Sequence, residues 1–515
     1  MNFTNIPFRA GLPVALAAIA LLSGCTTYTQ QTADFHESWK SGQLAAASIE
    51  IDKKADKNAN NQSTVVWSLE QGAVYRARAL ENQPPPVAAP TPQMQVAPSS
   101  DATPSVPYEV EMTRRSIDAF NWASDRITTY DEQAKAKVAS EAGAILTNPA
   151  NLSYRGRASD RIMLETYQAL NFLKLGEFDN ARVALNRVLQ HQRDAVEANA
   201  QRIAEAQAKA ADAKEGKVAD EQGQTAEYDT GKALEDEKVA AALQEVETEL
   251  ETDVRPYEVY VNPFAVFLDG LFFMTRGDDS SDMERARKSI ERVAGMAPDC
   301  SFLREDLQLA EGLAYGKKPD GLTYVVFETG SAPSLDQLLI PIPLFLVTSK
   351  VDYMQCALPR LKRDPFFTPA ADITVDGESV QTQLLCSMDS VVAREFKNEW
   401  PAVLTKSILS AGVKGLIQYQ VKKELKKQGG YADLIGSLVT SVYTATTTIA
   451  DTRSWTTLPK QFQYARFATP QSRTITIAAG GAPQTVALEP GKVNLVYVKN
   501  VAPGLPALIS QTVLK

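Results

Sequence analysis

Histidine is the scarcest residue of this 515-residue chain, which contains only His36 and His191. A Ser/His/Asp or Cys/His nucleophile system, and most zinc sites, need a histidine beside the reacting group. His36 lies near the N-terminus and His191 lies in a helical segment rich in polar residues, so we expect neither in a catalytic centre. CxxC, P-loop and GxGxxG patterns are also missing. The sequence therefore predicts no histidine-based enzyme, no cofactor and no metal site.

Basic residues are not in excess either. The net charge is −9, from 53 Lys and Arg against 62 Asp and Glu, and the two signs are mostly interspersed. Proteins that bind nucleic acid usually present a basic patch or stripe, so we expect no nucleic-acid partner. The hydrophobic content of 44% and charged content of 22% are ordinary for a globular protein.

Cysteine is nearly as scarce, and the first of the four cysteines marks the N-terminus as a targeting segment. A short apolar run at 10–22 leads into the sequence LSGC at 22–25. This run is too short to span a bilayer, and small residues before a cysteine resemble a bacterial lipobox. We expect residues 1–24 to be a lipoprotein signal peptide, Cys25 to be lipidated, and a short tether to follow. Thr26, in place of the Asp linked to inner-membrane retention, favours the outer membrane.

The other cysteines, Cys300, Cys356 and Cys386, would then lie in an exported compartment. Three cysteines allow at most one internal disulfide, and spacing alone does not identify the partners. Two alternatives remain open: a Cys356–Cys386 bond, or three buried thiols.

The clearest pattern in the chain is a pair of helical hairpins, at 154–189 and 262–298. In each, apolar residues recur every three or four positions on both sides of a glycine-containing turn. Glycine at the turn followed by a small residue on the second helix is similar to the tetratricopeptide repeat. The residues expected to make the repeat packing are Gly176, Phe178, Ala181, Leu185, Gly270, Phe273, Ala286 and Pro298.

One such hairpin cannot bury its apolar face alone, so neighbouring hairpins are expected. Further helices are predicted at 32–40, 44–54, 65–80, 109–133, 135–146 and 302–315. Residues 83–107, rich in Pro and Ala, predict a disordered insertion. Residues 190–253 predict an antiparallel, coiled helical arm with a flexible tip near 214–232. The fold predicted for 25–318 is therefore a mainly α, tetratricopeptide-like helical repeat solenoid with a helical-hairpin arm.

Residues 321–515 predict a smaller mixed α/β domain. Strand-like patterns occur at 322–328, 338–347, 373–375, 474–478, 485–488 and 493–499. Residues 390–427 predict a helix interrupted at Pro401. The apolar stretch 431–450 contains Asp433 and many hydroxyl groups, which favours a buried helix over a membrane span.

Two polar loops contain residues that bear on function. Asp278, Asp279 and Asp282 lack the glycine and glutamate of a calcium-binding EF-hand loop, so a solvated turn is expected. In the loop 450–459, Asp451, Arg453 and Trp455 are residue types common both in interface hot spots and in structural corners. Both alternatives are kept for that loop.

Four segments together resemble a family of uncharacterised bacterial lipoproteins with tetratricopeptide-type repeats. They are YRGRASDRIMLETYQALNFLKLGEFDNARVALNRVLQHQ at 154–192, NPFAVFLDGLFF at 262–273, VVFETGSAP at 325–333 and ADTRSWTTLP at 450–459. The resemblance implies a role in the cell envelope and brings no catalytic residues. The insertion at 83–107 departs from the family's pattern.

The function expected from these observations is a lipid-anchored, periplasm-facing scaffold, not an enzyme, that binds an envelope protein partner. The alternative is an envelope enzyme that acts on glycan or peptidoglycan through carboxylate pairs in residues 321–515, because such chemistry needs no histidine.

Overall fold

The structure is a computed structural model that describes residues 28–81, 106–140, 149–219, 223–252, 254–255, 257–344, 352–428 and 449–515. Cys25, most of the proline-rich insertion and most of the stretch 431–450 lie outside the described residues. Within these ranges, no helix combines the length and the hydropathy needed to cross a membrane.

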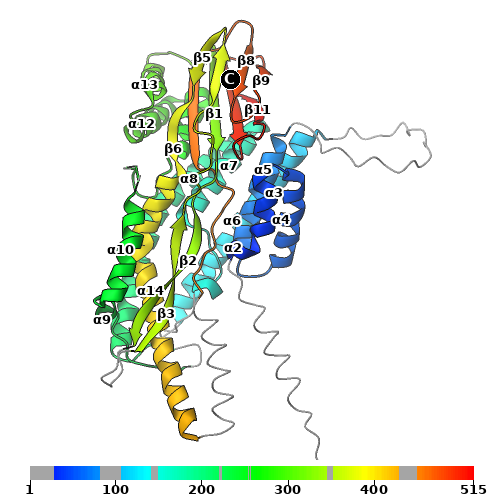
Figure 1. The fold of residues 1–515 in the computed structure, drawn as a ribbon. Helices are drawn as coiled ribbons and strands as arrows, with labels where there is room; N and C mark the ends of the chain where they lie inside the picture. The colour runs from blue at the N-terminus through cyan, green and yellow to red at the C-terminus, as the bar shows by residue number, and fades with distance from the viewer. Residues whose placement is uncertain are drawn as a thin grey trace, which may run out of the picture.

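Helices make up the first part of the chain (Figure 1). They are α2 (Tyr28–Gln31), α3 (Ala33–Lys40), α4 (Leu44–Asn58), α5 (Thr64–Ala79), α6 (Tyr108–Ser140), a 3-10 turn η1 (Pro149–Asn151), α7 (Ala158–Lys174), α8 (Phe178–Lys214), α9 (Thr230–Leu234), α10 (Glu237–Glu251), α11 (Pro263–Arg276), α12 (Ser280–Met296) and α13 (Ser301–Leu313).

Local sequence accounts for several helix ends. Gly176 takes a φ of +72° between α7 and α8, a conformation that costs a glycine little. Asn262 caps α11 by accepting hydrogen bonds from the backbone N–H groups of Phe264 and Ala265, with Pro263 in the first turn. Asp236 caps α10 in the same way. These signals place the hairpins α7–α8 and α11–α12 where the sequence pattern predicts them.

Strands and one long helix make up the rest. They are β1 (Leu322–Thr329), β2 (Ser334–Leu344), β3 (Asp352–Lys362), β4 (Asp372–Val375), β5 (Glu378–Gln381), β6 (Gln383–Ser387), α14 (Met388–Gln428), β7 (Gln461–Ala468), β8 (Thr474–Ala478), β9 (Gln484–Ala487), β10 (Val493–Asn500) and β11 (Leu508–Val513).

The strands form a five-stranded sheet with the order β11-β10-β1-β7-β6, a four-stranded sheet β5-β4-β8-β9 and the hairpin β2–β3. In the five-stranded sheet β1 and β10 are parallel, with Val325 opposite Val496, and the other neighbours are antiparallel. Tyr324 and Val326 face the helices, whereas Val325 and Phe327 pack with the four-stranded sheet. This part of the molecule therefore has three layers, which are the helices, the five-stranded sheet and the four-stranded sheet.

A second apolar core lies beside the hairpin β2–β3, which runs with α10 and α14 in the lower part of Figure 1. Its buried residues come from both strands, from α14 and from α10, where Val239, Leu243, Val246 and Leu250 repeat at helical spacing. This core joins segments that are far apart in the sequence into one elongated lobe.

The predicted tetratricopeptide-like solenoid is wrong. In a solenoid each hairpin is covered by neighbouring hairpins, but here the five-stranded sheet covers them. Phe264 of α11 stacks on Phe462 of β7 with ring centroids 3.9 Å apart, and Phe267 lies 4.6 Å from Tyr464. One continuous core contains helical residues together with strand residues from beyond position 318. Hairpin periodicity shows which face is buried but not what buries it.

The predicted helical-hairpin arm is wrong for the same reason. The distal half of α8 packs on α14, where Asn199 donates to the Asn398 carbonyl at 3.0 Å and Arg202 pairs with Glu399 at 2.7 Å. α10 buries its apolar stripe against α14 and the β2–β3 hairpin. The distal half of α8, together with α10, is thus part of this lobe and not a separate coiled pair.

Three smaller differences concern secondary structure. α14 continues through Pro401, and α6 is one helix over most of the span predicted as two. Strands β3, β5, β6, β7 and β11 were not predicted. β7 shows the reason: Phe462, Gln463, Tyr464 and Ala465 are all buried, so the alternation typical of a half-exposed strand is missing.

The close contact of α11 with α12 gives a stability prediction. A Cβ atom at Gly270 would lie 2.6 Å from Cδ1 and 2.8 Å from Cγ1 of the buried Ile290. Gly270→Ala should therefore force the helices apart and lower the free energy of unfolding by about 1–3 kcal/mol. Denaturant unfolding of the full chain measures this.

The matched control is Gly295→Ala in α12, where an added Cβ meets no atom within 4 Å. Alanine has the higher helix propensity, so this change should leave stability unaltered or raise it by up to about 1 kcal/mol. Equal effects of the two substitutions would contradict the close packing at Gly270.

Candidate functional site

The chain is joined to the folded body from its first described residue. Tyr28 is buried, its hydroxyl donates to Glu70 Oε1 at 3.3 Å, and its ring lies 4.9 Å from that of Trp67. Thr29 donates its hydroxyl to the Leu335 carbonyl at 3.0 Å. α2 therefore bridges α5 and the start of β2, three residues after the predicted lipidation site Cys25, which itself lies outside the described residues.

Glu70 is the polar centre under α2. Its fully buried carboxylate accepts hydrogen bonds from the backbone N–H and the hydroxyl groups of Thr456 and Thr457, at 2.5–3.2 Å. Burial raises the pKa of Glu70, while these four donors act in the opposite direction. The carboxylate thereby ties α5 to the loop 450–459.

His36 joins the same network, with Nε2 2.5 Å from Thr456 Oγ1. Because the Thr456 hydroxyl proton is donated to Glu70, the hydrogen bond needs a proton on His36 Nε2. Burial, with the nearby charge of Lys40, lowers the pKa of His36 to about 4. The ring is therefore neutral near pH 7 and acts as a donor.

Arg453 of the loop 450–459 is bound by other segments of the described chain. It donates to both carboxylate oxygens of Asp451 at 2.7 Å, and to the carbonyls of Gln62 at 3.1 Å and Leu152 at 2.8 Å. Its guanidinium thus holds the loop to the segments before α5 and before α7.

Trp455 is 2% exposed. Its ring lies 5.6 Å from Phe120 and 5.8 Å from Tyr167, and its Nε1 donates to Thr457 at 2.9 Å. A side chain so placed is not accessible to a partner protein. Together with the contacts of Arg453, this position favours the structural corner over the interface hot spot.

A second buried ionic centre joins the helices to the sheet. Glu328 of β1 pairs with Lys499 of β10, accepts from Tyr167 at 2.9 Å, and accepts from Tyr497. Burial alone would raise the pKa of Glu328, but Lys499 and Arg76 lower it overall. The carboxylate is ionised and fully used by its neighbours, as expected for a structural ion pair.

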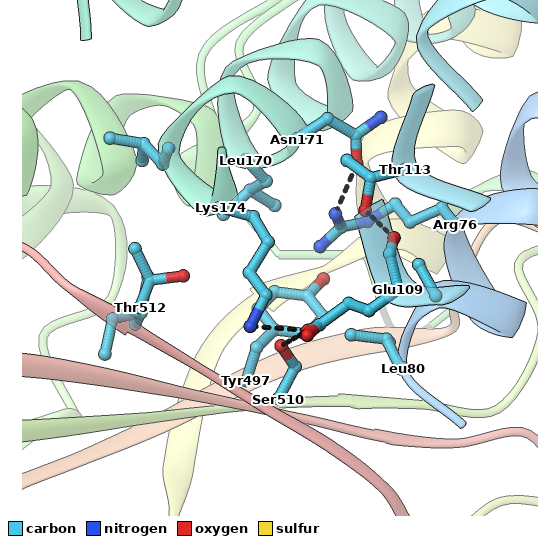
Figure 2. A pocket seen from close by; sticks show the side chains of 13 residues that line it. Arg76, Leu80, Glu109, Thr113, Leu170, Asn171, Lys174, Tyr497, Ser510 and Thr512 are labelled. Atoms are coloured by element: carbon cyan, nitrogen blue, oxygen red, sulfur yellow. Dashed lines mark hydrogen bonds and ion pairs between the residues drawn. The ribbon is translucent and has the colours of Figure 1, made fainter. Parts of the chain in front are cut away.

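Figure 2 shows a hollow between this centre and the surface, where α5, α6 and α7 meet β10 and β11. Lys174 pairs with Glu109 at 2.5 Å, and Ser510 donates to Glu109 at 3.1 Å. Arg76 donates to Asn171 at 2.8 Å. The cavity volume of about 20 Å³ has room for about one water molecule. The hollow is a polar joint between helices and sheet and has no room for an organic ligand.

The residues predicted to make repeat packing lie in the helix hairpins. Ala181, Leu185 and Ala286 are buried, Gly270 contacts Ile290, and Phe178 lies under Arg276, whose guanidinium carbon is 3.6 Å from the ring centroid. Phe273 lies against Arg182 and Arg285, at 4.8 and 4.0 Å. Pro298 is exposed and follows the end of α12.

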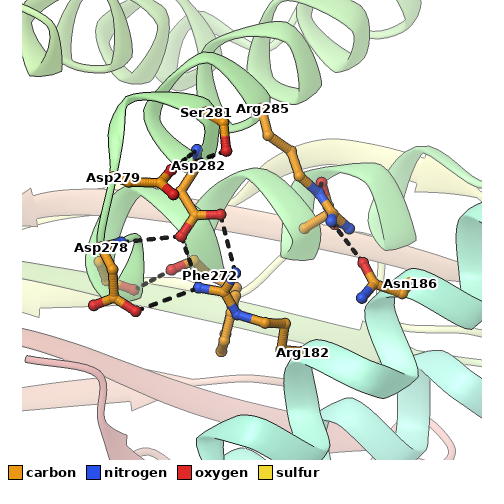
Figure 3. Close-up of polar contacts among 10 residues, drawn as sticks. Arg182, Asn186, Phe272, Asp278, Asp279, Ser281, Asp282 and Arg285 are labelled. Carbon is orange, nitrogen blue, oxygen red and sulfur yellow. Dashed lines mark hydrogen bonds and ion pairs between the residues drawn. The ribbon is translucent and has the colours of Figure 1, made fainter.

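The acidic turn 278–282 joins the same contact between α8, α11 and α12 (Figure 3). Asp279 caps α12, and Asp282 accepts two hydrogen bonds from Arg182 at 2.7 and 3.0 Å. Asp278 is exposed and lies 3.6 Å from Arg182. The helix cap and the ion pairs with Arg182 account for these carboxylates, so their arrangement does not require a metal ion.

The three cysteines beyond the N-terminal segment are free and buried. The Cys356–Cys386 bond therefore does not form, and the three-thiol alternative holds. Burial raises the pKa of Cys300 to about 11 and those of Cys356 and Cys386 to about 12. Thiols of this kind are unreactive packing groups.

The enzyme alternative needs a pair of neighbouring carboxylates in residues 321–515. Glu395 and Glu399 of α14 are such a pair, since the charge of Glu399 acts on Glu395. Glu395 accepts from the backbone N–H groups of Ala158 at 2.6 Å and Ser159 at 3.2 Å, so it caps α7. Burial, together with the charge of Glu399, raises the pKa of Glu395 to about 7. Glu399 pairs with Arg202. Both carboxylates are thus engaged in holding α7 and α8 to α14.

Sequence reasoning missed the polar residues that join distant segments, above all Glu70 and Glu328. A lone acid inside an apolar run, as in VVWSLEQ at 65–71 and VVFETG at 325–330, is the signal that points to them. In the described part of the chain, no three His, Cys, Asp or Glu side chains gather closely enough to hold a metal ion.

The neutral state of the half-buried His36 predicts a pH effect. The unfolded chain takes up this proton near pH 6.5, whereas the folded protein takes it up only near pH 4. The contribution of neutral His36 to the free energy of unfolding is therefore complete above about pH 6.5 and is lost as the pH falls towards 4. His36→Gln keeps an N–H donor but does not titrate, so it should gain stability relative to the unchanged protein over that interval.

The measurement is the free energy of unfolding of both proteins at several pH values. Glu37→Gln, an exposed change on the same helix, is the control. A difference between His36→Gln and the unchanged protein that stays constant from about pH 7 to about pH 4 would contradict the assignment.

Comparison of the chain with protein-family models, with curated proteins and with solved structures gave no match.

Proposed function

We propose that this protein is a lipid-anchored scaffold of the bacterial cell envelope, attached to the outer membrane through Cys25 and facing the periplasm, where it binds an envelope protein. The sequence LSGC at 22–25 supports the anchor. The resemblance of four segments to uncharacterised bacterial lipoproteins supports the compartment.

The observation that carries the proposal is the position of Tyr28. Three peptide bonds separate it from Cys25, and an extended chain of that length spans about 10 Å. Because Tyr28 is buried against Glu70 and Trp67, a lipid on Cys25 would hold the whole body against the membrane surface. Such placement suits a scaffold that presents a fixed face to a partner in or near the membrane.

The buried carboxylates add support for a role in binding and not in catalysis. Glu70, Glu328 and Glu395 each accept several hydrogen bonds from the protein itself. Groups held in this way stabilise the arrangement of helices and sheet.

Cys25→Ser tests the anchor. Without the thiol no lipid can be attached, so the protein should leave the outer-membrane fraction and mass spectrometry should find no acyl groups. Cys300→Ala, at a buried free thiol, is the control and should keep both lipid and fractionation. Unchanged mass and fractionation of the Cys25 variant would refute the lipoprotein.

A spacer tests the close attachment. Twenty Gly and Ser residues inserted between Thr27 and Tyr28 would allow a root-mean-square separation of about 25 Å. The protein should remain membrane-bound and keep its melting temperature, but crosslinks to its partner in cells should be strongly reduced. Undiminished crosslinks to the same partner would show that the partner does not need the body to be held at the membrane.

A further inference from the structure

A cavity of about 140 Å³ lies between α6, α7 and α8, away from the contacts described above. Its walls combine two apolar side chains with several polar ones. The lining residues are Ser124, Ile127, Thr128, Asp131, Arg161, Leu164, Glu165, His191 and Asp194. Thr128 and Asp194 are exposed at the mouth, whereas Ile127, Leu164 and Glu165 are buried.

Glu165 is the unusual residue of this cavity. Its side chain is 1% exposed, and its Oε2 atom has no hydrogen-bond partner. The other oxygen lies 3.8 Å from Arg187 Nη1 and 4.0 Å from His191 Nε2, which is too far for a hydrogen bond. An unsatisfied buried carboxylate oxygen is costly, and a ligand that donates a hydrogen bond would remove that cost.

The two arginines near Glu165 interact mainly with other groups or with solvent. Arg161 donates to both oxygens of Asp131, at 2.7 and 3.0 Å, and to the carbonyl of Arg155. Arg187 points mostly to solvent, with a side chain 58% exposed. The cavity therefore offers hydrogen-bond acceptors to a ligand more than it offers donors.

His191 adds a neutral group. Burial, followed by the positive charges of Arg161 and Arg187, lowers its pKa to about 4. Its ring nitrogens make no hydrogen bond within the described part of the chain. At neutral pH the unprotonated ring nitrogen of the imidazole can accept a hydrogen bond from a ligand beside Glu165.

From this geometry we infer that the cavity between α6, α7 and α8 binds a small aliphatic primary amine, whose ammonium group donates to Glu165 Oε2 and to His191. Ile127 and Leu164 would contact the methylene chain, and Asp194 would attract the cation at the mouth. A cavity of about 150 Å³ in an engineered protein holds benzene, so the volume here suits a ligand of about six non-hydrogen atoms. This inference does not depend on the proposed scaffold function.

Binding should be coupled to a proton. Burial raises the pKa of Glu165 to about 7, against the lowering effect of Arg187. An ammonium ligand favours the ionised carboxylate, so binding should release a proton and tighten as the pH rises from about 6 to about 8. The charged and titratable groups around Glu165 are Asp131 on α6, Arg161 on α7, and Arg187, His191 and Asp194 on α8. Among these, His191 stays neutral throughout that range.

Isothermal titration calorimetry of the full-length protein with butane-1,4-diamine tests the inference, and butane-1,4-diol is the uncharged control of the same shape. We expect saturable binding of the diamine at millimolar concentration or below, a heat that depends on the ionisation enthalpy of the buffer, and no binding of the diol. Absence of diamine binding, or equal binding of the diol, would overturn the inference.

Two variants locate the site. Glu165→Gln should weaken diamine binding about tenfold or more, as expected for loss of a charged hydrogen-bond partner. Glu132→Gln, an exposed change on α6, should not alter it. If Glu165→Gln fails to fold, Thr128→Trp at the exposed mouth blocks entry without changing the interior, and it should abolish binding. Full binding by a folded Glu165→Gln or Thr128→Trp protein would exclude this cavity.

Discussion

The face of the five-stranded sheet that carries Tyr324, Phe462 and Tyr464 must be kept from water, and the helices do this. Each buried tyrosine hydroxyl also needs a partner, which selects the helix that lies over it. Tyr324 and Tyr464 donate to Asp306 of α13 at 2.8 and 3.1 Å. Further along β1, Glu328 accepts a hydrogen bond from Tyr167 of α7 at 2.9 Å. Apolar burial thus supplies most of the driving force, and a few buried acids determine the positions of the helices.

The loop 450–459 acts in the same way between α5, α7 and β2. Thr456 and Thr457 donate to both oxygens of Glu70. The arginine of the loop donates to two backbone carbonyls, and its tryptophan packs beside Phe120. Because α2 also donates to Glu70, the start of the body and a loop near its end share one buried carboxylate. A change in the position of α2 would therefore also affect this loop and the strand β2 beside it.

Local features of the fold could be predicted from the sequence, and distant pairings could not. Gly176 and Asn262 mark helix ends through conformation and capping, which depend on a few neighbouring residues. The solenoid was inferred by supposing that the apolar faces of hairpins meet one another, whereas strands from beyond residue 320 cover them. For the candidate site, residue type left Asp451, Arg453 and Trp455 open between an interface and a structural corner, because it does not show which way side chains face. Glu165 carried no sequence signal, because the unsatisfied state of a carboxylate exists only in three dimensions, and His191 was set aside because its neighbours in the sequence are polar.

The late position of β7 and β10 in the sequence, far from the helices that the sheet covers, has a consequence for biogenesis. A chain delivered from its N-terminus, by the ribosome or through a membrane, presents its helices long before residues 461–500 arrive to cover them. Until then Phe264, Phe267 and their neighbours have no sheet to pack on. Non-local pairing of this kind slows folding, and the intermediates expose apolar surface and are prone to aggregate. The helical part would therefore need protection from aggregation until those strands are made, and a prematurely terminated chain would keep an exposed aromatic face that proteases could recognise.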